Sequence, residues 1–249
     1  MNLCIDEGNT RVKLAVFHQN KLLHFEAVPK LSPTILHGMQ KQFPLLTNVI
    51  LSSVRLPQVE IMTFLNTQFQ FFIELSHNTY LPISNNYHTP KTLGKDRIAG
   101  VVAGNHMYPN TDLLVIDAGT CITYDCITAK GCYEGGSISP GIAMRFKSLP
   151  HFTAKLPLVD VSSVQQAIPP LIGKSTLGAI QSGIANGVAA EFWGIVHQYR
   201  QLYPKIKVII TGGDLHFFES RFKNEIFAHQ NLILEGLNAI LHFNLSKYE

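Results

Sequence analysis

The sequence begins MNLCIDEGNTRVKLAVF (residues 1–17), in which two apolar segments flank a short acidic turn that contains a glycine. Residues 3–6 and 12–18 have the apolar and β-branched character of strands. Asp6 ends the first strand, where a carboxylate costs free energy unless it is paired, hydrogen-bonded or bound to a cation. The turn that follows offers backbone N–H groups and small polar side chains, which suit a phosphate. The stretch predicts a phosphate-binding turn, with Asp6 holding a cation that bridges to phosphate oxygens.

The same pattern recurs in DLLVIDAGTCITYDCITAKGCYEGGSI (residues 112–138). The strands predicted in this second copy span residues 113–117, 122–127 and 132–138, and they match 3–6, 12–18 and 22–28 in the first copy. An Asp-x-Gly turn follows the first strand of each copy. Such self-similarity predicts two lobes of common plan, residues 1–110 and 111–249, that face each other across a cleft. Coincidence between two ordinary hairpins is the alternative.

The rest of the chain alternates predicted helices with predicted strands, which indicates an α/β protein. Residues 177–202 form a long helical pattern with one apolar stripe and Pro204 beyond its end. A late strand then ends in a third glycine turn, TGGD (residues 211–214). The apolar stripe predicts core packing or a dimer interface, and periodicity does not separate these two roles.

Composition excludes several classes of protein. The 249 residues are 46% hydrophobic and 15% charged, with a formal net charge of +3, which indicates a compact globular protein without a basic nucleic-acid-binding surface. The chain has neither the charged start of a secretory signal nor an apolar stretch of about 18 residues. We therefore expect a cytoplasmic protein that binds neither nucleic acid nor membrane.

The four cysteines, at positions 4, 121, 126 and 132, lie in strand-like segments and match no zinc or redox spacing. They are expected to be reduced and to pack as small apolar side chains, so no metal is assigned to them.

Three glycine turns in two similar lobes resemble the fold shared by actin, sugar and acetate kinases and heat-shock chaperone ATPases, whose lobes are ribonuclease H-like with mixed sheets facing a central cleft. Within that superfamily the chain resembles the type III pantothenate kinase family. The motifs that carry this resemblance are DEGNTRVK (6–13), NNYHTPKTLGKDRIAG (85–100), DAGTCIT (117–123), EGGSISPGIAM (134–144), GKST (173–176), ITGGD (210–214) and LILEGL (232–237). They cover nearly the whole chain in the family's order.

The resemblance implies roles for particular residues. ATP would bind at Asp6, Glu7, Gly8, Asn9, Thr10, Arg11, Val12, Lys13 and Thr120. Pantothenate would bind at Tyr87, Gly94, Lys95, Asp96, Arg97 and Thr176, with Asp96 as the catalytic base. Asp117 resembles the ligand of an activating monovalent cation, K⁺ or NH₄⁺. Cys121 stands where the family more often has a small residue, which affects packing near Asp117 rather than its role.

These roles suit phosphoryl transfer, in which an enzyme mainly positions the reactants and stabilises charge. An ordinary aspartate is ionised at neutral pH and can accept the proton of the substrate hydroxyl. Arg97 offers a forked donor to a carboxylate such as that of pantothenate, or to the transferring phosphate. The resemblance also implies Mg²⁺ and a homodimer. The alternatives are a kinase for another hydroxylated carboxylic acid, a kinase-like regulator without catalysis, and a chaperone- or filament-type ATPase.

Overall fold

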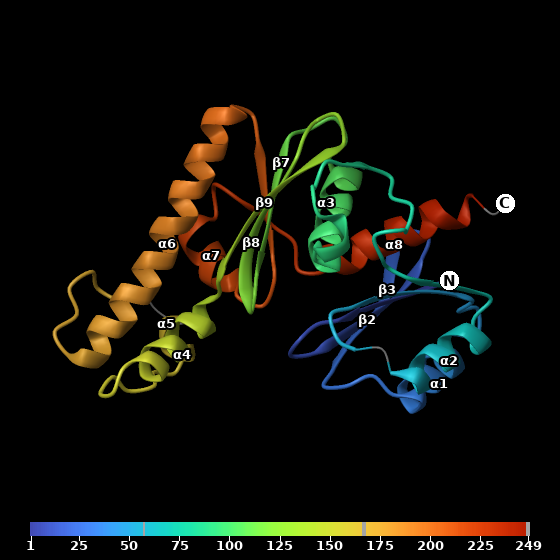
Figure 1. Ribbon diagram of the computed structural model, residues 1–249, viewed down its shortest axis with the longest axis horizontal. Helices are drawn as coiled ribbons and strands as arrows, with labels where there is room; N and C mark the ends of the chain where they lie inside the picture. The colour runs from blue at the N-terminus through green and yellow to red at the C-terminus, as the bar shows by residue number, and fades with distance from the viewer. Residues whose placement is uncertain (57, 166–167, 248–249) are drawn as a thin grey trace. The chain divides into compact units, whose positions relative to one another are not determined.

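The computed structural model describes residues 1–56, 58–165 and 168–247. It is an α/β structure with two mixed sheets, and the chain divides into two compact units that are described here one at a time (Figure 1). Unit 1 contains Met1–Pro109, Gly131–Tyr133 and Asn231–Glu249, and unit 2 contains Asn110–Lys130 and Glu134–Gln230. Each unit carries its own hydrophobic core.

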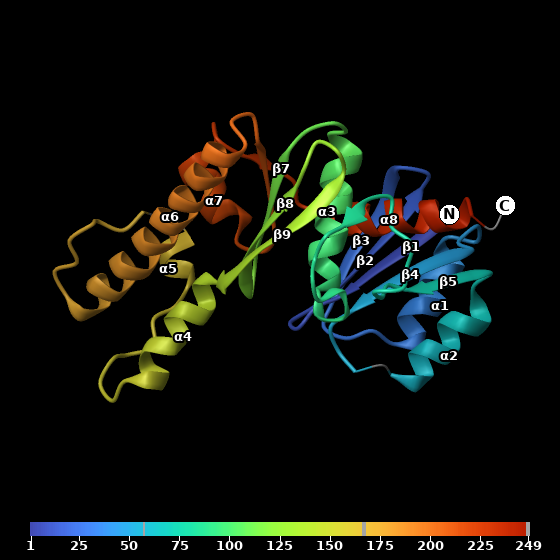
Figure 2. The same ribbon diagram turned by 45° about the horizontal axis from the view of Figure 1, so that its top comes forward.

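Unit 1 is built on a five-stranded sheet in the order β3-β2-β1-β4-β5. Its strands are β1 (Asn2–Glu7), β2 (Val12–His18), β3 (Lys21–Val28), β4 (Asn48–Ser53) and β5 (Phe71–Glu74). The hairpin strands β1, β2 and β3 are antiparallel, whereas β4 and β5 run parallel to β1. Helices α1 (Pro33–Gln42) and α2 (Val59–Gln68) cover one face of this sheet, and α8 (Leu232–Leu245) covers the other (Figure 2). Helix α3 (Lys95–Met107) packs on α8.

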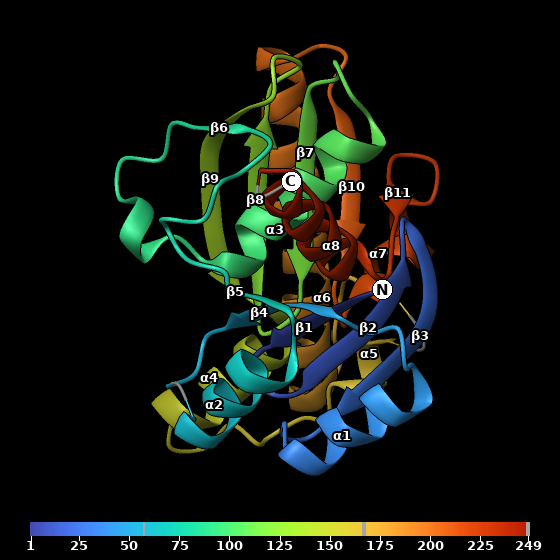
Figure 3. The same cartoon turned by 90° about the vertical axis from the view of Figure 1, so that its right-hand side faces the viewer.

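Unit 2 is built on the sheet β11-β10-β7-β8-β9-β6. Its strands are β7 (Leu113–Ala118), β8 (Cys121–Ile127), β9 (Cys132–Pro140), β10 (Lys207–Thr211) and β11 (Phe227–Ala228). The two-residue strand β6 (Ser84–Asn85) pairs with β9 at Cys132 and Tyr133, residues that cluster with unit 1 (Figure 3). The helices of this unit are α4 (Ile142–Phe152), α5 (Ser162–Gln165), α6 (Thr176–Leu202) and α7 (Leu215–Phe222), and the apolar face of α6 enters the core of the unit.

The strands expected in both hairpins form, with ends that differ from the predicted ones by at most two residues. The chain passes from unit 1 to unit 2 between Pro109 and Asn110, and the segment from Asn231 onward returns to unit 1. Helix α8 clusters with unit 1 because its apolar surface packs on α3 and β1. The described part of this C-terminal segment ends at residue 247, and the two expected lobes, residues 1–110 and 111–249, stay a prediction.

The four cysteines are free thiols, two of them buried (Cys4 and Cys126) and two partly buried (Cys121 and Cys132). Burial raises the pKa of Cys4 and raises that of Cys126 to about 11, which keeps both thiols protonated at neutral pH. Among the described residues, no helix combines the length and the apolar character needed to cross a membrane.

Gly236 sets the contact between α8 and α3. A Cβ at this position would lie 1.8 Å from the carbonyl oxygen of Ala99, so Gly236→Ala must push the two helices apart. We expect this variant to lose roughly 2 kcal/mol of unfolding free energy, measured by urea denaturation. Gly38→Ala is the matched control, because a Cβ at this exposed position of α1 meets no atom within 4 Å. The control should gain roughly 0.5–1 kcal/mol; an equal loss in both variants would contradict the close-packing explanation.

Candidate active site

The turn after β1 is held by backbone and side-chain contacts. The backbone N–H of Gly8 donates to the carbonyl oxygen of Arg11 at 3.1 Å. Arg55, which follows β4, donates from Nε to the Gly8 carbonyl (3.1 Å) and from Nη2 to the Asn9 carbonyl (3.0 Å). Strand β4 lies directly beside β1, so a residue far away in sequence fixes the shape of this turn. Arg55 was not among the residues expected in the site, and its place just after the strand at residues 48–53 is its one sequence signal.

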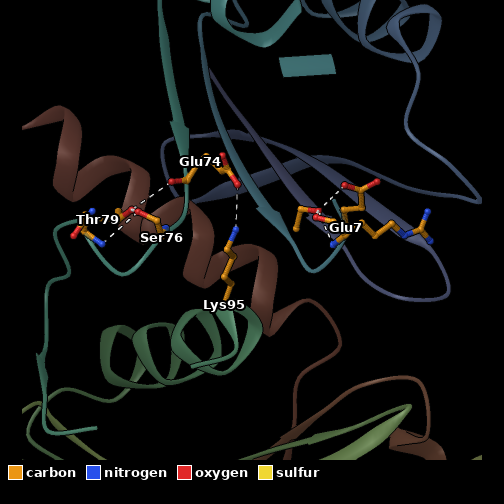
Figure 4. Close-up of polar contacts among 8 residues, drawn as sticks. Glu7, Glu74, Ser76, Thr79 and Lys95 are labelled. Atoms are coloured by element: carbon orange, nitrogen blue, oxygen red, sulfur yellow. Dashed lines mark hydrogen bonds and ion pairs between the residues drawn. The ribbon is translucent and has the colours of Figure 1, made fainter. Parts of the chain in front are cut away.

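Two residues expected in the ATP site turn their side chains elsewhere. The Glu7 side chain is 5% exposed, and it accepts a hydrogen bond from Ser53 Oγ at 2.7 Å (Figure 4). Val12 is fully buried in the core of unit 1. Only the backbones of these two residues are therefore available to a nucleotide, whereas Asn9, Thr10 and Arg11 are exposed.

Asp6 lies between one positive and one negative group. Lys13 is its cross-strand partner in the β1–β2 ladder, and Asp96 is near enough to interact with it electrostatically. Burial raises the pKa of Asp6 from 3.8 to about 6, the Lys13 ammonium opposes that rise, and the Asp96 carboxylate adds to it. Unit 1 thus brings together three of the residues expected at the reaction centre, from segments almost ninety residues apart in the sequence.

Asp96 occupies the first turn of α3. One of its carboxylate oxygens, Oδ1, accepts a hydrogen bond from the backbone N–H of Arg97 at 2.8 Å. A carboxylate at this end of a helix is stabilised by the unpaired N–H groups and the helix dipole. Gly94, directly before the helix, leaves room for it, because a Cβ there would lie 2.5 Å from Asp96 Oδ1. The turn therefore fixes a partly exposed carboxylate beside Asp6.

Lys95 is tied to the end of β5. Its Nζ lies 3.2 Å from Glu74 Oε1 (Figure 4), and both side chains are partly exposed, so the pair contributes little to stability. The contact joins the β5 end to the residue directly before Asp96, which makes it a positioning contact for the start of α3. Glu74 was not expected in the site, since a pair between elements 21 residues apart has no local sequence pattern.

Arg97 and Tyr87, both expected to bind the acceptor, are in contact. The Arg97 guanidinium lies 5.5 Å from the centre of the Tyr87 ring. That ring stacks on Tyr133 at 6.0 Å between ring centres, and Tyr133 is fully buried. Arg97 is 5% exposed. Its guanidinium, a largely buried planar cation at the start of α3, therefore lies against the stacked rings of Tyr87 and Tyr133.

The second Asp-x-Gly turn lies in unit 2. The backbone N–H of Gly119 donates to the carbonyl of Cys121 at 2.9 Å, a backbone bond that does not depend on the unusual cysteine side chain. Gly141, after β9, donates to the carbonyl of Thr120 at 3.1 Å, and a Cβ on Gly141 would lie 2.5 Å from that oxygen. The EGGSISPG segment therefore packs against the backbone of this turn, and the Thr120 side chain stays exposed.

The remaining residues expected in the site also belong to unit 2. Asp117 is the second-to-last residue of β7, and its Oδ1 lies so near Gly212 that a Cβ on Gly212 would approach it to 2.5 Å. Gly212 has a φ of 104°, which glycine adopts freely. Thr176 is exposed at the start of α6, after Ser175, whose Oγ accepts the backbone N–H of Gly178 at 3.1 Å. Among the described residues no group of three or more His, Cys, Asp and Glu side chains could form a metal cluster.

The two sheets and their helices define the class of protein. The structure matches a glucokinase from an Antarctic psychrotroph with a TM-score of 0.56 at 12% identity, over 97% of this chain and 98% of that one. It also matches a Campylobacter jejuni protein described as a Baf family transcriptional activator, with a TM-score of 0.64 at 23% identity, over 98% and 99% of the two chains. The chain therefore has the fold of sugar kinases of this type, as the glycine turns predicted.

Sequence comparison then gives the family. Residues 2–198 match the family model described as type III pantothenate kinase. The chain is 46% identical to the type III pantothenate kinase of Christiangramia forsetii over 245 residues, which is 98% of this chain and 99% of that protein. This protein belongs to the type III pantothenate kinase family.

Proposed function

We propose that the protein transfers the γ-phosphoryl group of ATP to the primary hydroxyl of pantothenate and forms 4'-phosphopantothenate, the first step of coenzyme A biosynthesis. Family membership along nearly the full chain carries this proposal. The structure supports it because Asp6, which precedes the predicted phosphate-binding turn, and Asp96, the expected base, are near enough in unit 1 for the Asp96 charge to raise the pKa of Asp6.

In this reaction the chain positions the phosphates and removes one proton. The backbone of the turn after β1 and the Lys13 ammonium bind phosphate oxygens, and Asp6 is the carboxylate that would hold Mg²⁺. When bound, Mg²⁺ neutralises negative charge on the phosphates. Asp96 accepts the hydroxyl proton of the acceptor as the new bond forms. Asp96 lies in the first turn of α3, directly after Gly94 and Lys95 of the same segment.

The acceptor would lie against Tyr87 and the start of α3. Arg97 supplies the planar, forked donor that binds a carboxylate with two parallel hydrogen bonds, and pantothenate ends in a carboxylate. Gly94 and Lys95 are the other residues of this proposed acceptor site, and Lys95 forms an ion pair with Glu74. The family resemblance also assigns a role in pantothenate binding to Thr176, which is exposed at the start of α6.

Three further assignments belong to the proposal. Asp117 would hold the activating monovalent cation, K⁺ or NH₄⁺, beside the exposed Thr120 of the second phosphate turn. The protein would act in the cytoplasm as a homodimer.

The direct test is ATP-dependent phosphorylation of pantothenate by the purified protein with Mg²⁺, in KCl or in NaCl at equal ionic strength. Mass spectrometry of the product and release of ADP are measured together. We expect one phosphopantothenate for each ADP, with turnover at least about tenfold higher in KCl. ATP hydrolysis without transfer would point to another hydroxylated acid as the acceptor, and absence of both reactions in either salt would favour a regulator.

A further inference from the structure

Asp117 lies in a row of three polar residues across the sheet of unit 2. Its antiparallel partner on β8 is Thr123, and its parallel partner on β10 is Thr211. Directly paired residues in a ladder place their side chains on the same face of the sheet, with Cβ atoms about 5 Å apart. The Asp117 carboxylate is therefore flanked by two hydroxyl groups.

The two hydroxyls differ in their hydrogen bonds. Thr211 is 1% exposed, and its Oγ1 donates to the carbonyl of Gln230 at 3.4 Å. Thr123 is 8% exposed, and within the described part of the chain its Oγ1 has no hydrogen-bond partner. Burial of a hydroxyl without a hydrogen-bond partner costs free energy. The Thr123 oxygen is therefore a candidate to contact a bound ligand.

The surroundings of Asp117 favour a cation that takes neutral oxygen ligands. The backbone of Gly212 lies against Asp117 Oδ1, and a Cβ there would also approach the carbonyl oxygen of Ala118 to 2.2 Å. One carboxylate, a hydroxyl and nearby carbonyl oxygens match a singly charged ion, whose hydration shell is replaced by neutral oxygen dipoles. The single carboxylate also balances the charge of such an ion.

We propose that the hydroxyl oxygen of Thr123 is a further ligand of the monovalent cation at Asp117, an inference that rests on the cation site assigned under the proposed function. Thr123 binds the ion through an oxygen lone pair and thereby adds a neutral ligand on the β8 side of the carboxylate. Thr211, whose hydroxyl is engaged by Gln230, is not a ligand. Thr123 and Asp117 together then determine the preference of this site for K⁺ over Na⁺.

The test measures the thermal unfolding midpoint as KCl replaces NaCl at constant ionic strength, with and without Mg²⁺ and ADP. An ion that binds the folded state raises the midpoint as its concentration passes its dissociation constant. For wild type we expect a K⁺-dependent rise. Thr123→Val should need at least tenfold more K⁺ for the same rise, and it should unfold in NaCl at the wild-type midpoint or above, because it removes a hydroxyl without a partner. Thr123→Ser keeps the oxygen and should restore the response.

Thr211→Val is the matched control from the other side of Asp117. It should lower the midpoint in every salt, because it removes the hydrogen bond to Gln230, and it should keep the wild-type dependence on K⁺. The proposal is overturned if Thr123→Val keeps that dependence, if Thr123→Ser fails to restore it, or if Thr211→Val loses it too. It is also overturned if wild type shows no K⁺ response in either condition.

These outcomes are separable from the proposed function. If the protein phosphorylates pantothenate but its unfolding midpoint does not depend on K⁺, the proposal for Thr123 is wrong and the proposed kinase activity stands. If the midpoint depends on K⁺ through Thr123 but the protein does not phosphorylate pantothenate, the proposal for Thr123 stands and pantothenate is not the acceptor.

Discussion

Replacing Asp96 with asparagine is expected to lower kcat for pantothenate phosphorylation by about 10²–10⁴-fold, the usual contribution of a positioned base. The amide cannot take up the proton that leaves the acceptor hydroxyl. Binding should change much less, because the other contacts to both substrates remain, so the KM values should stay within a few-fold of wild type. Steady-state kinetics with ATP and pantothenate varied separately provide the measurement.

The fold should survive this substitution for a structural reason. Asp96 Oδ1 accepts the backbone N–H of Arg97, and the carbonyl oxygen of an asparagine can accept the same bond. Asp112→Asn is the matched control, since Asp112 Oδ1 accepts the backbone N–H of Ala129 at 2.7 Å and has no part in the proposed site. The control should keep wild-type kcat. An Asp96→Asn enzyme with kcat within twofold of wild type would remove Asp96 as the base.

The sequence was most informative where structure is local. Each hairpin strand could be predicted because alternating apolar residues and a glycine turn lie within a few residues of one another. Gly94 and Asp96 were expected from the family motif, and the structure shows how they are arranged locally, with Gly94 directly before the helix and Asp96 in its first turn. The proposed role of Asp6 started from a burial cost that a single residue already indicates, and the structure adds the raised pKa that this cost implies.

Contacts between distant segments could not be predicted in this way. The Glu74–Lys95 pair depends on where β5 ends relative to α3, and Arg55 reaches the first turn only because β4 lies beside β1. The place of α8 in unit 1 depends on the absence of a side chain at Gly236, where the Ala99 carbonyl approaches. A motif likewise marks Glu7 as part of the phosphate turn, but only the structure shows that its carboxylate is bonded to Ser53.

Replacing Asp6 with asparagine is expected to stabilise the ligand-free protein at neutral pH while it weakens binding of Mg²⁺ and ATP. In the folded state burial raises the pKa of Asp6 to about 6, so the folded protein binds this proton more tightly than the unfolded chain does. Ionisation of Asp6 therefore costs stability once the pH exceeds the unfolded value of about 4, and the cost reaches its full size above pH 6. For this partly buried group it is on the order of 2 kcal/mol.

The change in unfolding free energy caused by Asp6→Asn should be positive and should depend on pH. In urea denaturation at pH 7.5, the free energy of unfolding of Asp6→Asn should exceed that of wild type by roughly 2 kcal/mol. The difference should fall to about half near pH 5 and become small near pH 4, where Asp6 is protonated in the folded state and about half protonated in the unfolded chain. Lys13→Met gives the opposite sign, because the Lys13 ammonium lowers the pKa of Asp6, and its loss makes the ionised carboxylate more costly. A gain in Asp6→Asn that is equal at pH 4 and pH 7.5 would attribute it to packing and remove the charge explanation. A gain that follows the predicted window would show that ionised Asp6 carries a burial cost in the ligand-free protein, which is the cost that a cation bound to this carboxylate would offset.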